Sequence, residues 1–100
     1  MLVDIPVAKD AKTATSQALF EKVVEESIEF MAMRLLFMEM GEEEKAVTNR
    51  STVKSMMCKE LIDMIFACNT LLASYVPSED ERQKLYESVV EKNKARGYYD

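Results

Sequence analysis

Histidine and tryptophan are absent from this chain of 100 residues, and glycine and proline occur only twice each. The absence of histidine excludes Ser-His and Cys-His catalysis, His-ligated zinc sites and the Glu-x-x-His pattern of di-iron bundles. The scarcity of glycine and proline, together with 48% hydrophobic residues, favours a single and mostly helical domain over residues 1–100. Carboxylate and metal chemistry is the main catalytic repertoire that this composition leaves.

Basic residues are outnumbered, because 13 Lys and Arg face 18 Asp and Glu and give a net charge of −5. Affinity for nucleic acid is dominated by Lys and Arg contacts to phosphate, so we expect no nucleic acid polymer as a partner. A small phosphorylated ligand is compatible with this charge, since bound metal and a few local cations can neutralise it.

Long apolar runs are also lacking. No stretch is long enough to span a membrane, and the first residues show no basic region or continuous apolar segment of signal-peptide type. Cys58 and Cys68 fall in one expected helix, about 15 Å apart along its axis, which is too far for a disulfide. We expect both to be small core residues. These features predict a cytoplasmic protein without a membrane partner.

The expected order of elements begins with an N-terminal arm over residues 1–12. A Thr- and Ser-rich cluster at residues 13–16 can supply the N-cap of a first helix that runs to about Met40, where Gly41 is well placed to stop it. A polar connection with at most a short helical turn is expected over residues 42–50.

The second helix is expected to start at a cap provided by Asn49 or Ser51 and to reach about Tyr75, because Pro77 disfavours continuation. The predicted fold class is therefore all-α: a helical bundle of three long helices plus a short element. A core of this size is modest, so apolar surface left over after folding would indicate completion by oligomerisation.

The first helix is apolar on more than one side. One stripe comprises Phe20, Val24, Ile28, Met31, Leu35 and Met38, and the other comprises Val23, Phe30, Met33 and Phe37. We therefore expect this helix to lie centrally in a bundle or across a subunit interface.

Two acidic stretches, Glu25-Glu26-Ser27-Ile28-Glu29 and Glu60-Leu61-Ile62-Asp63, interrupt the first two helices. Spacings of three and four residues place the carboxylates of each stretch on one helix face. In the second stretch, Glu60 falls in the middle of an apolar stripe formed by Val53, Met56, Met64, Ala67 and Leu71. A carboxylate in that position is expected to point into a core.

Converging buried carboxylates need a partner. At about 5 Å and an effective dielectric of about 20, two of them repel by about 3 kcal/mol. A divalent cation removes this cost, and an all-oxygen ligand set suits Mg²⁺, Mn²⁺ or Ca²⁺. The alternatives are a solvated stripe for the first stretch and, for Glu60, a buried ion pair with Arg34, Lys54 or Lys59.

The third helix is expected to begin at Ser78, which has capping-box spacing to Glu81, and to end near Gly97. Its buried face is predicted to contain Leu85, Tyr86, Val89 and Val90. The same side continues to Lys92, Asn93 and Arg96, where contact with a phosphate or carboxylate is favoured over simple complementation of the helix dipole.

The Glu-Glu-x-x-Glu and Glu-x-x-Asp motifs on successive long helices, with the closing Glu91-Lys92-Asn93-Lys94-Ala95-Arg96-Gly97-Tyr98, resemble the MazG-like all-α nucleoside triphosphate pyrophosphohydrolases over residues 18–98. The resemblance implies a bundle assembled from more than one subunit, a homodimer or homotetramer. It also implies Mg²⁺-dependent cleavage of a nucleoside triphosphate to the monophosphate and pyrophosphate. The long spacing from Glu29 to Glu60 suggests an enlarged connection between the motif helices.

Carried over position by position, the resemblance implies roles for eight residues. The metal ligands would be Glu26, Glu29, Glu60 and Asp63, with Glu25 as a supporting or water-orienting carboxylate. The phosphates would be bound by Lys92, Asn93 and Arg96. The substrate base is not indicated, and phosphoribosyl-ATP is an alternative substrate. Two alternatives to an enzyme remain open, a non-catalytic helical interaction protein and a nucleotide-binding sensor on the same fold.

Overall fold

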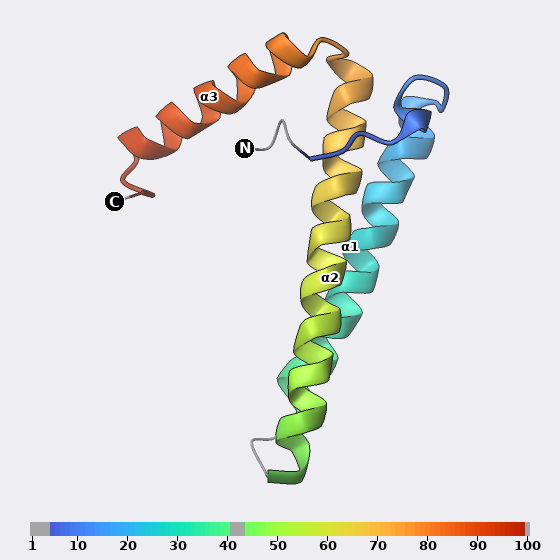
Figure 1. Cartoon of the computed structure of the whole chain (residues 1–100), viewed down its shortest axis with the longest axis vertical. Coiled ribbons are helices and arrows are strands. Elements are labelled where there is room, and N and C mark those ends of the chain that lie inside the picture. Colours follow the sequence, from blue (N-terminus) through green and yellow to red (C-terminus); the bar gives the residue numbers. More distant parts are fainter. Residues whose placement is uncertain (1–4, 41–43, 100) are drawn as a thin grey trace.

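The computed structural model describes residues 5–40 and 44–99, and the side chains in these ranges except those of 44–48. All regular structure in this part of the chain is helical, which confirms the all-α prediction. A short 3₁₀ turn, η2 (Lys9–Ala11), precedes three helices, α1 (Ser16–Glu39), α2 (Glu44–Tyr75) and α3 (Glu79–Ala95). α1 and α2 form a long antiparallel hairpin, and α3 projects from its upper end (Figure 1).

The helix starts follow the capping residues of the sequence. Thr15 caps α1, because its hydroxyl accepts a hydrogen bond from the Ala18 amide at 3.1 Å. Ser78 caps α3 in the same way, through the Glu81 amide at 3.3 Å. Both starts were expected, as was the extent of α3.

The start of α2 was predicted wrongly. The helix begins at Glu44, ahead of the expected caps at Asn49 and Ser51. The long spacing between the acidic motifs is therefore taken up by helix, because α1 and α2 both continue past the motifs toward the closed end of the hairpin (Figure 1). Gly41, the expected stop of the first helix, lies outside the described residues.

The seam between α1 and α2 follows alternating steps of four and three residues. On α1, the residues shielded from solvent recur at Leu19, Val23, Glu26, Phe30, Met33 and Phe37. On α2, they recur at Val53, Met57, Glu60, Met64, Ala67 and Leu71. This is the heptad spacing of helices that pack side by side. It confirms the predicted stripe around Glu60, except that Met57 takes the place expected for Met56.

The described part of the N-terminal arm packs on α2. The Ile5 carbonyl accepts a hydrogen bond from Asn69 Nδ2 at 3.1 Å, and the Ala8 amide donates to Thr70 Oγ1 at 3.2 Å. Asn69 and Thr70 are buried. The arm thus crosses α2 before the η2 turn leads into α1 (Figure 1).

α3 leaves the hairpin at a bend of 120° relative to the part of α2 from Asn49 to Tyr75. The Arg82 guanidinium stabilises the turn by donating to the Val76 and Pro77 carbonyls at 2.7 and 2.9 Å. The Tyr86 hydroxyl donates to Asn69 Oδ1, which joins α3 to the same α2 residue that binds the arm.

The predicted buried face of α3 is wrong for the single chain. Leu85, Val89 and Val90 are exposed, and Tyr86 is half-buried. The reason is the bend, which directs α3 away from the hairpin instead of along it (Figure 1). A groove of about 380 Å³ inside the bend has an almost wholly apolar lining that includes Leu61, Ile65, Cys68 and Leu72.

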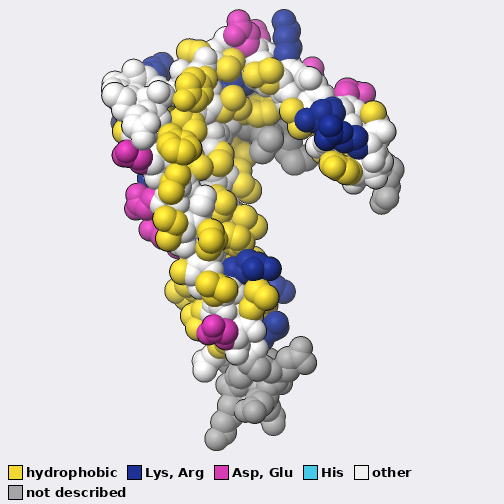
Figure 2. All heavy atoms as spheres, turned by 180° about the vertical axis from the view of Figure 1, so that it is seen from behind, with side chains coloured by type: hydrophobic (Ala, Val, Ile, Leu, Met, Phe, Trp, Pro, Cys, Tyr) yellow, Lys and Arg dark blue, Asp and Glu magenta, His cyan; other side chains and the backbone are white. Residues whose placement is uncertain are grey.

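Apolar surface also runs along the hairpin (Figure 2). The first α1 stripe, from Phe20 to Met38, is exposed throughout, with Ile28 at 60%. The chain exposes 7689 Å², whereas a compact protein of 11.5 kDa exposes about 5,800 Å². Its radius of gyration is 16.9 Å, against about 13 Å for a compact 100-residue domain. One chain therefore leaves about 1,900 Å² more surface exposed than a compact fold of this mass.

Cys58 and Cys68 are free thiols and both are exposed, so their prediction as core residues is wrong. Within the described ranges, no single helix is long and apolar enough to cross a membrane, and α2 with α3 passes that test only as a bent pair, by length and composition.

Candidate metal centre

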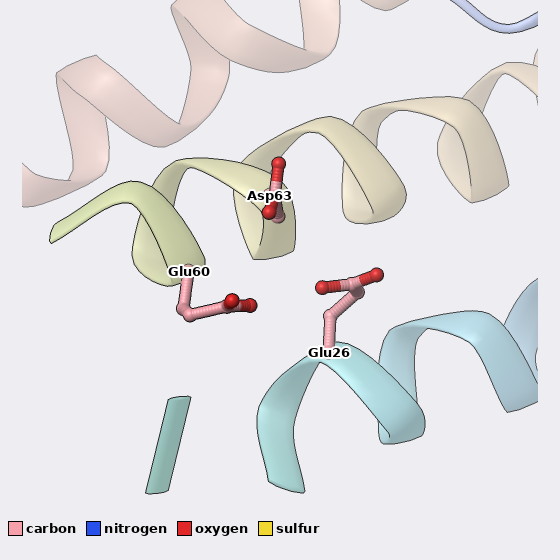
Figure 3. A group of neighbouring side chains, drawn as sticks. All are labelled: Glu26, Glu60 and Asp63. Carbon is pink, nitrogen blue, oxygen red and sulfur yellow. The ribbon is translucent and has the colours of Figure 1, made fainter. Parts of the chain in front are cut away.

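Two positions of the α1–α2 seam carry carboxylates where the heptad pattern would place apolar side chains. Glu26 of α1 and Glu60 of α2 occupy these positions, and Asp63 lies one turn along α2 from Glu60. One carboxylate oxygen from each of the three lies within 4.8 Å of the others. Figure 3 shows Glu26 and Glu60 reaching toward each other across the seam. The hairpin thus brings the two acidic motifs together in one carboxylate cluster.

Glu26 is the most deeply buried member of this carboxylate cluster, with an exposed fraction of 7%. Its Oε1 accepts an ion-pair contact from Lys22 Nζ at 2.9 Å, while its Oε2 is buried without a hydrogen-bond partner among the described residues. Glu60 Oε2 is likewise buried and unpartnered. Since buried polar atoms are nearly always satisfied, these two oxygens are available as ligands for a cation.

No ion pair of Glu60 with Arg34, Lys54 or Lys59 occurs among the described residues, and the cation that pairs with the cluster is Lys22, through Glu26. Lys22 precedes Glu26 by four residues, and this spacing was the sequence signal from which the ion pair could have been predicted. The hydrogen bond and the charge of Glu26, followed by the charge of Glu25, raise the pKa of the Lys22 ammonium above its ordinary value of 10.5. Lys22 is half-exposed, so it neutralises one oxygen of the cluster from the solvent side.

Glu29 lies on the exposed side of the same site. Repulsion from Glu26, followed by desolvation and repulsion from Glu60, raises the pKa of the Glu29 carboxyl above its ordinary value of 4.5. Glu29 follows Glu26 by about one turn of α1, and the charges that raise its pKa are those of the two seam carboxylates. The four acids predicted as metal ligands therefore gather at one place in the hairpin, although only Glu26, Glu60 and Asp63 meet at ligand spacing.

The donor set fits a hard divalent cation. This set contains only carboxylate oxygens. The ammonium of Lys22 compensates only part of the negative charge of the carboxylate cluster. Mg²⁺, Mn²⁺ and Ca²⁺ prefer such ligands, whereas zinc is bound mostly by sulfur and nitrogen. The unpartnered oxygens of Glu26 and Glu60 are the observation that favours an ion over a purely structural salt bridge.

The remaining predicted site residues lie elsewhere. Glu25 is exposed and points toward Lys22, with Oε1 at 3.8 Å from Nζ. Lys92 and Arg96 are exposed, and the amide of Asn93 donates to the Tyr99 hydroxyl at 3.2 Å. Because α3 projects away from the hairpin, one chain does not bring this end of α3 to the carboxylate cluster (Figure 1).

A cleft of about 380 Å³ opens beside the carboxylate cluster, between the arm and the hairpin. Glu26, Asp63 and Lys22 line it at the cluster, and Phe66 and Asp10 line it farther toward the arm. The sequence did not single out Phe66 or Asp10. Phe66 could have been found from its position three residues after Asp63, but the position of Asp10 depends on the path of the arm.

Scans of this chain against protein-family models, curated proteins and solved structures found no match.

Proposed function

We propose that the chain is a Mg²⁺-dependent nucleotide pyrophosphohydrolase, with Mn²⁺ as an alternative ion, that cleaves a nucleoside triphosphate to the monophosphate and pyrophosphate. The observation that carries the proposal is the group of carboxylates in the hairpin seam, with two buried oxygens that have no hydrogen-bond partner among the described residues. The resemblance of the two acidic motifs to MazG-like enzymes supplies the reaction. A triphosphate is also the kind of ligand that a carboxylate site can bind through a shared cation.

The proposed roles are those that the resemblance implies, and the positions of the residues support them. Glu26, Glu60 and Asp63 hold the ion, with Glu29 completing the set from the solvent side. When bound, the metal supplies neutralisation of the phosphates, their alignment and the activation of water. Glu25, exposed beside Lys22, is a supporting or water-orienting carboxylate. Lys22 holds one oxygen of Glu26, which fixes the orientation of that carboxylate.

We also propose that the active form is a homodimer or homotetramer. The excess surface of about 1,900 Å² per chain is in the range that obligate homodimers bury per subunit. A second copy would cover the outer stripe of α1 and the apolar side of α3. Since α3 turns away from its own hairpin, Lys92, Asn93 and Arg96 are proposed to bind the phosphates of a substrate held by another copy.

The test of the reaction is pyrophosphate release from a panel of canonical and modified nucleoside triphosphates and from phosphoribosyl-ATP, with Mg²⁺ and with EDTA. The expected result is metal-dependent release of pyrophosphate, with the monophosphate as co-product. Release of orthophosphate, or release that persists in EDTA, would contradict the proposal. Binding of nucleotide without turnover would identify a nucleotide-binding sensor on the same fold.

Mixing two inactive variants tests the shared site. Glu60→Gln removes a metal ligand and Arg96→Gln removes a phosphate contact. If each site uses residues of two chains, random reassembly restores intact sites to about a quarter of the total. If both residues act within one chain, every site still carries one of the two substitutions and the mixture stays inactive.

A second candidate function is a non-catalytic helical interaction protein. The exposed α1 stripe favours it, because such a stripe can pack against a helix of a different partner. This function predicts that Mg²⁺ has no effect on the thermal stability of the chain. The metal-dependent stabilisation described in the Discussion would contradict it.

A further inference from the structure

The cleft beside the carboxylate cluster has the size and lining of a small-molecule site. Its volume is about 380 Å³, within the usual range for ligand pockets. It extends along α2 from Asp63 to Thr70, about 10 Å at the rise of an α-helix. Small side chains at Ala14, Ala18 and Ala67 leave this space open. The cleft therefore continues the metal centre in one direction, toward the arm.

The surfaces of the cleft differ along its length. At the metal centre it presents Glu26, whose Oε2 is buried and unpartnered, together with Asp63. Farther along, Phe66 contributes an aromatic side chain that is 41% exposed. An aromatic side chain on a partly open surface can stack with any nucleobase. A metal-bound phosphate at one end would place the nucleoside of the same substrate against Phe66.

The arm lines one side of the cleft and places a carboxylate there. The arm is anchored by the Ala8 amide on Thr70 Oγ1, at 3.2 Å. The Asp10 carbonyl accepts hydrogen bonds from the amides of Thr13 and Ala14, at 3.1 and 2.8 Å, so the backbone at Asp10 is fixed. The Asp10 side chain lines the cleft and makes no hydrogen bond or ion pair with the described residues. It is available to a ligand.

We propose that this cleft is the nucleoside subsite and that Asp10 reads the base, favouring bases with an amino group over uracil and thymine. This inference rests on the proposed function. An ionised carboxylate only accepts hydrogen bonds, so it pairs with the amino group of cytosine, adenine or guanine. The carbonyl oxygen at the corresponding position of uracil offers no donor and is repelled. Phe66 acts as the stacking surface for every base.

The experiment compares kcat/KM for pairs of substrates that differ at one amino group, dCTP with dUTP and dGTP with dITP. The wild-type protein is expected to prefer the amino-bearing member of at least one pair. Asp10→Asn is expected to lower that preference about tenfold, because a hydrogen bond to a charged acceptor is lost. Phe66→Leu is expected to raise KM for all four alike. Asp80→Asn, an exposed substitution on α3, is the matched control.

The outcomes separate this proposal from the proposed function. Metal-dependent pyrophosphate release with a base preference that Asp10→Asn leaves unchanged would overturn the base-reading role, while the reaction stands. A wild-type protein without preference in either pair would do the same. If no pyrophosphate is released from any of these four substrates, the base-reading role is wrong, and the wider substrate panel alone decides whether the reaction stands. Circular dichroism of each variant confirms that the helices are retained.

Discussion

The α1–α2 hairpin and α3 differ in how their apolar residues are covered. In the hairpin, heptad positions of the two helices shield each other, and the exceptional residues in the seam are the carboxylates of Glu26 and Glu60. In α3, the apolar residues Leu85, Val89 and Val90 face solvent. Carboxylates within an otherwise apolar seam support the proposed cation, whereas the uncovered apolar face of α3 supports the proposed contact with a second copy. The same physical rule, that buried polar and exposed apolar groups need partners, thus gives two different functional inferences.

The largest expected effect is on the hairpin side. Glu60→Gln is expected to reduce kcat/KM for pyrophosphate release at least about 100-fold, because even residues that only support metal ligands are worth about 10- to 100-fold. Glu39→Gln, an exposed substitution on α1, is the control and should leave the rate unchanged. Both variants should sediment like the wild type. A Glu60→Gln protein with wild-type activity would show that the seam carboxylate holds no catalytic ion.

An effect of similar size is expected for α3, on self-association instead of on catalysis. Val89→Glu should weaken self-association about 100-fold, since a buried valine contributes about 1.5 kcal/mol and the change occurs in both copies of a symmetric dimer. Sedimentation at several concentrations measures it, with Glu91→Gln as the control. If Val89→Glu leaves the sedimentation coefficient unchanged, the apolar face of α3 is not an interface between copies.

The next effect is on thermal stability, and it distinguishes a metal-binding site from a structural ion pair. At a Mg²⁺ concentration of about 100 times Kd, the native state gains about 2.7 kcal/mol, which corresponds to a rise in Tm of about 10 °C or more for a chain of this size. Glu60→Gln should abolish the rise. In EDTA this variant should be at least as stable as the wild type, because a buried charge is removed. A lower Tm of the variant in EDTA would support the ion-pair interpretation.

The smallest effect is a pH dependence carried by Glu29. Its folded-state pKa lies above the ordinary value of 4.5, so the folded chain binds more protons than the unfolded chain as pH rises from that value. The metal-free protein should therefore lose stability, relative to Glu29→Gln, as pH rises from about 4.5 through the raised pKa. Thermal melts in EDTA measure this difference. With saturating Mg²⁺ it should disappear or reverse, since the ion requires the deprotonated carboxylate. Identical pH profiles in EDTA would contradict the placement of Glu29 beside the seam.

Much of the helical architecture could be predicted from the sequence, because its signals are local. Thr15 and Ser78 cap their helices through neighbouring amides, and Pro77 follows the end of α2. The start of α2 could not be predicted in the same way. Asn49 and Ser51 have good capping chemistry, but the helix extends beyond them to Glu44, and near this end Arg50 packs over the Phe37 ring of α1 at 4.1 Å from its centroid.

The carboxylate cluster was predictable in part. The spacing within each motif fixed which carboxylates share a helix face, and the heptad position of Glu60 indicated burial. The partner of Glu26 was not identified, since several cations could reach a seam position and only the structure selects Lys22. The cleft was not predictable, because it depends on where the arm crosses the hairpin.

The sequence by itself determined three helices, the N-caps of α1 and α3 and two acidic motifs, since hydrogen bonds and helical periodicity within about one turn specify them. Only the tertiary structure decided the rest. The antiparallel pairing of α1 and α2 brought Glu26 to Glu60 and Asp63 from distant parts of the chain. The 120° bend separated α3 from the hairpin, because the turn is held by Arg82 and by the contact of Tyr86 with Asn69. Such contacts join residues that no local pattern relates.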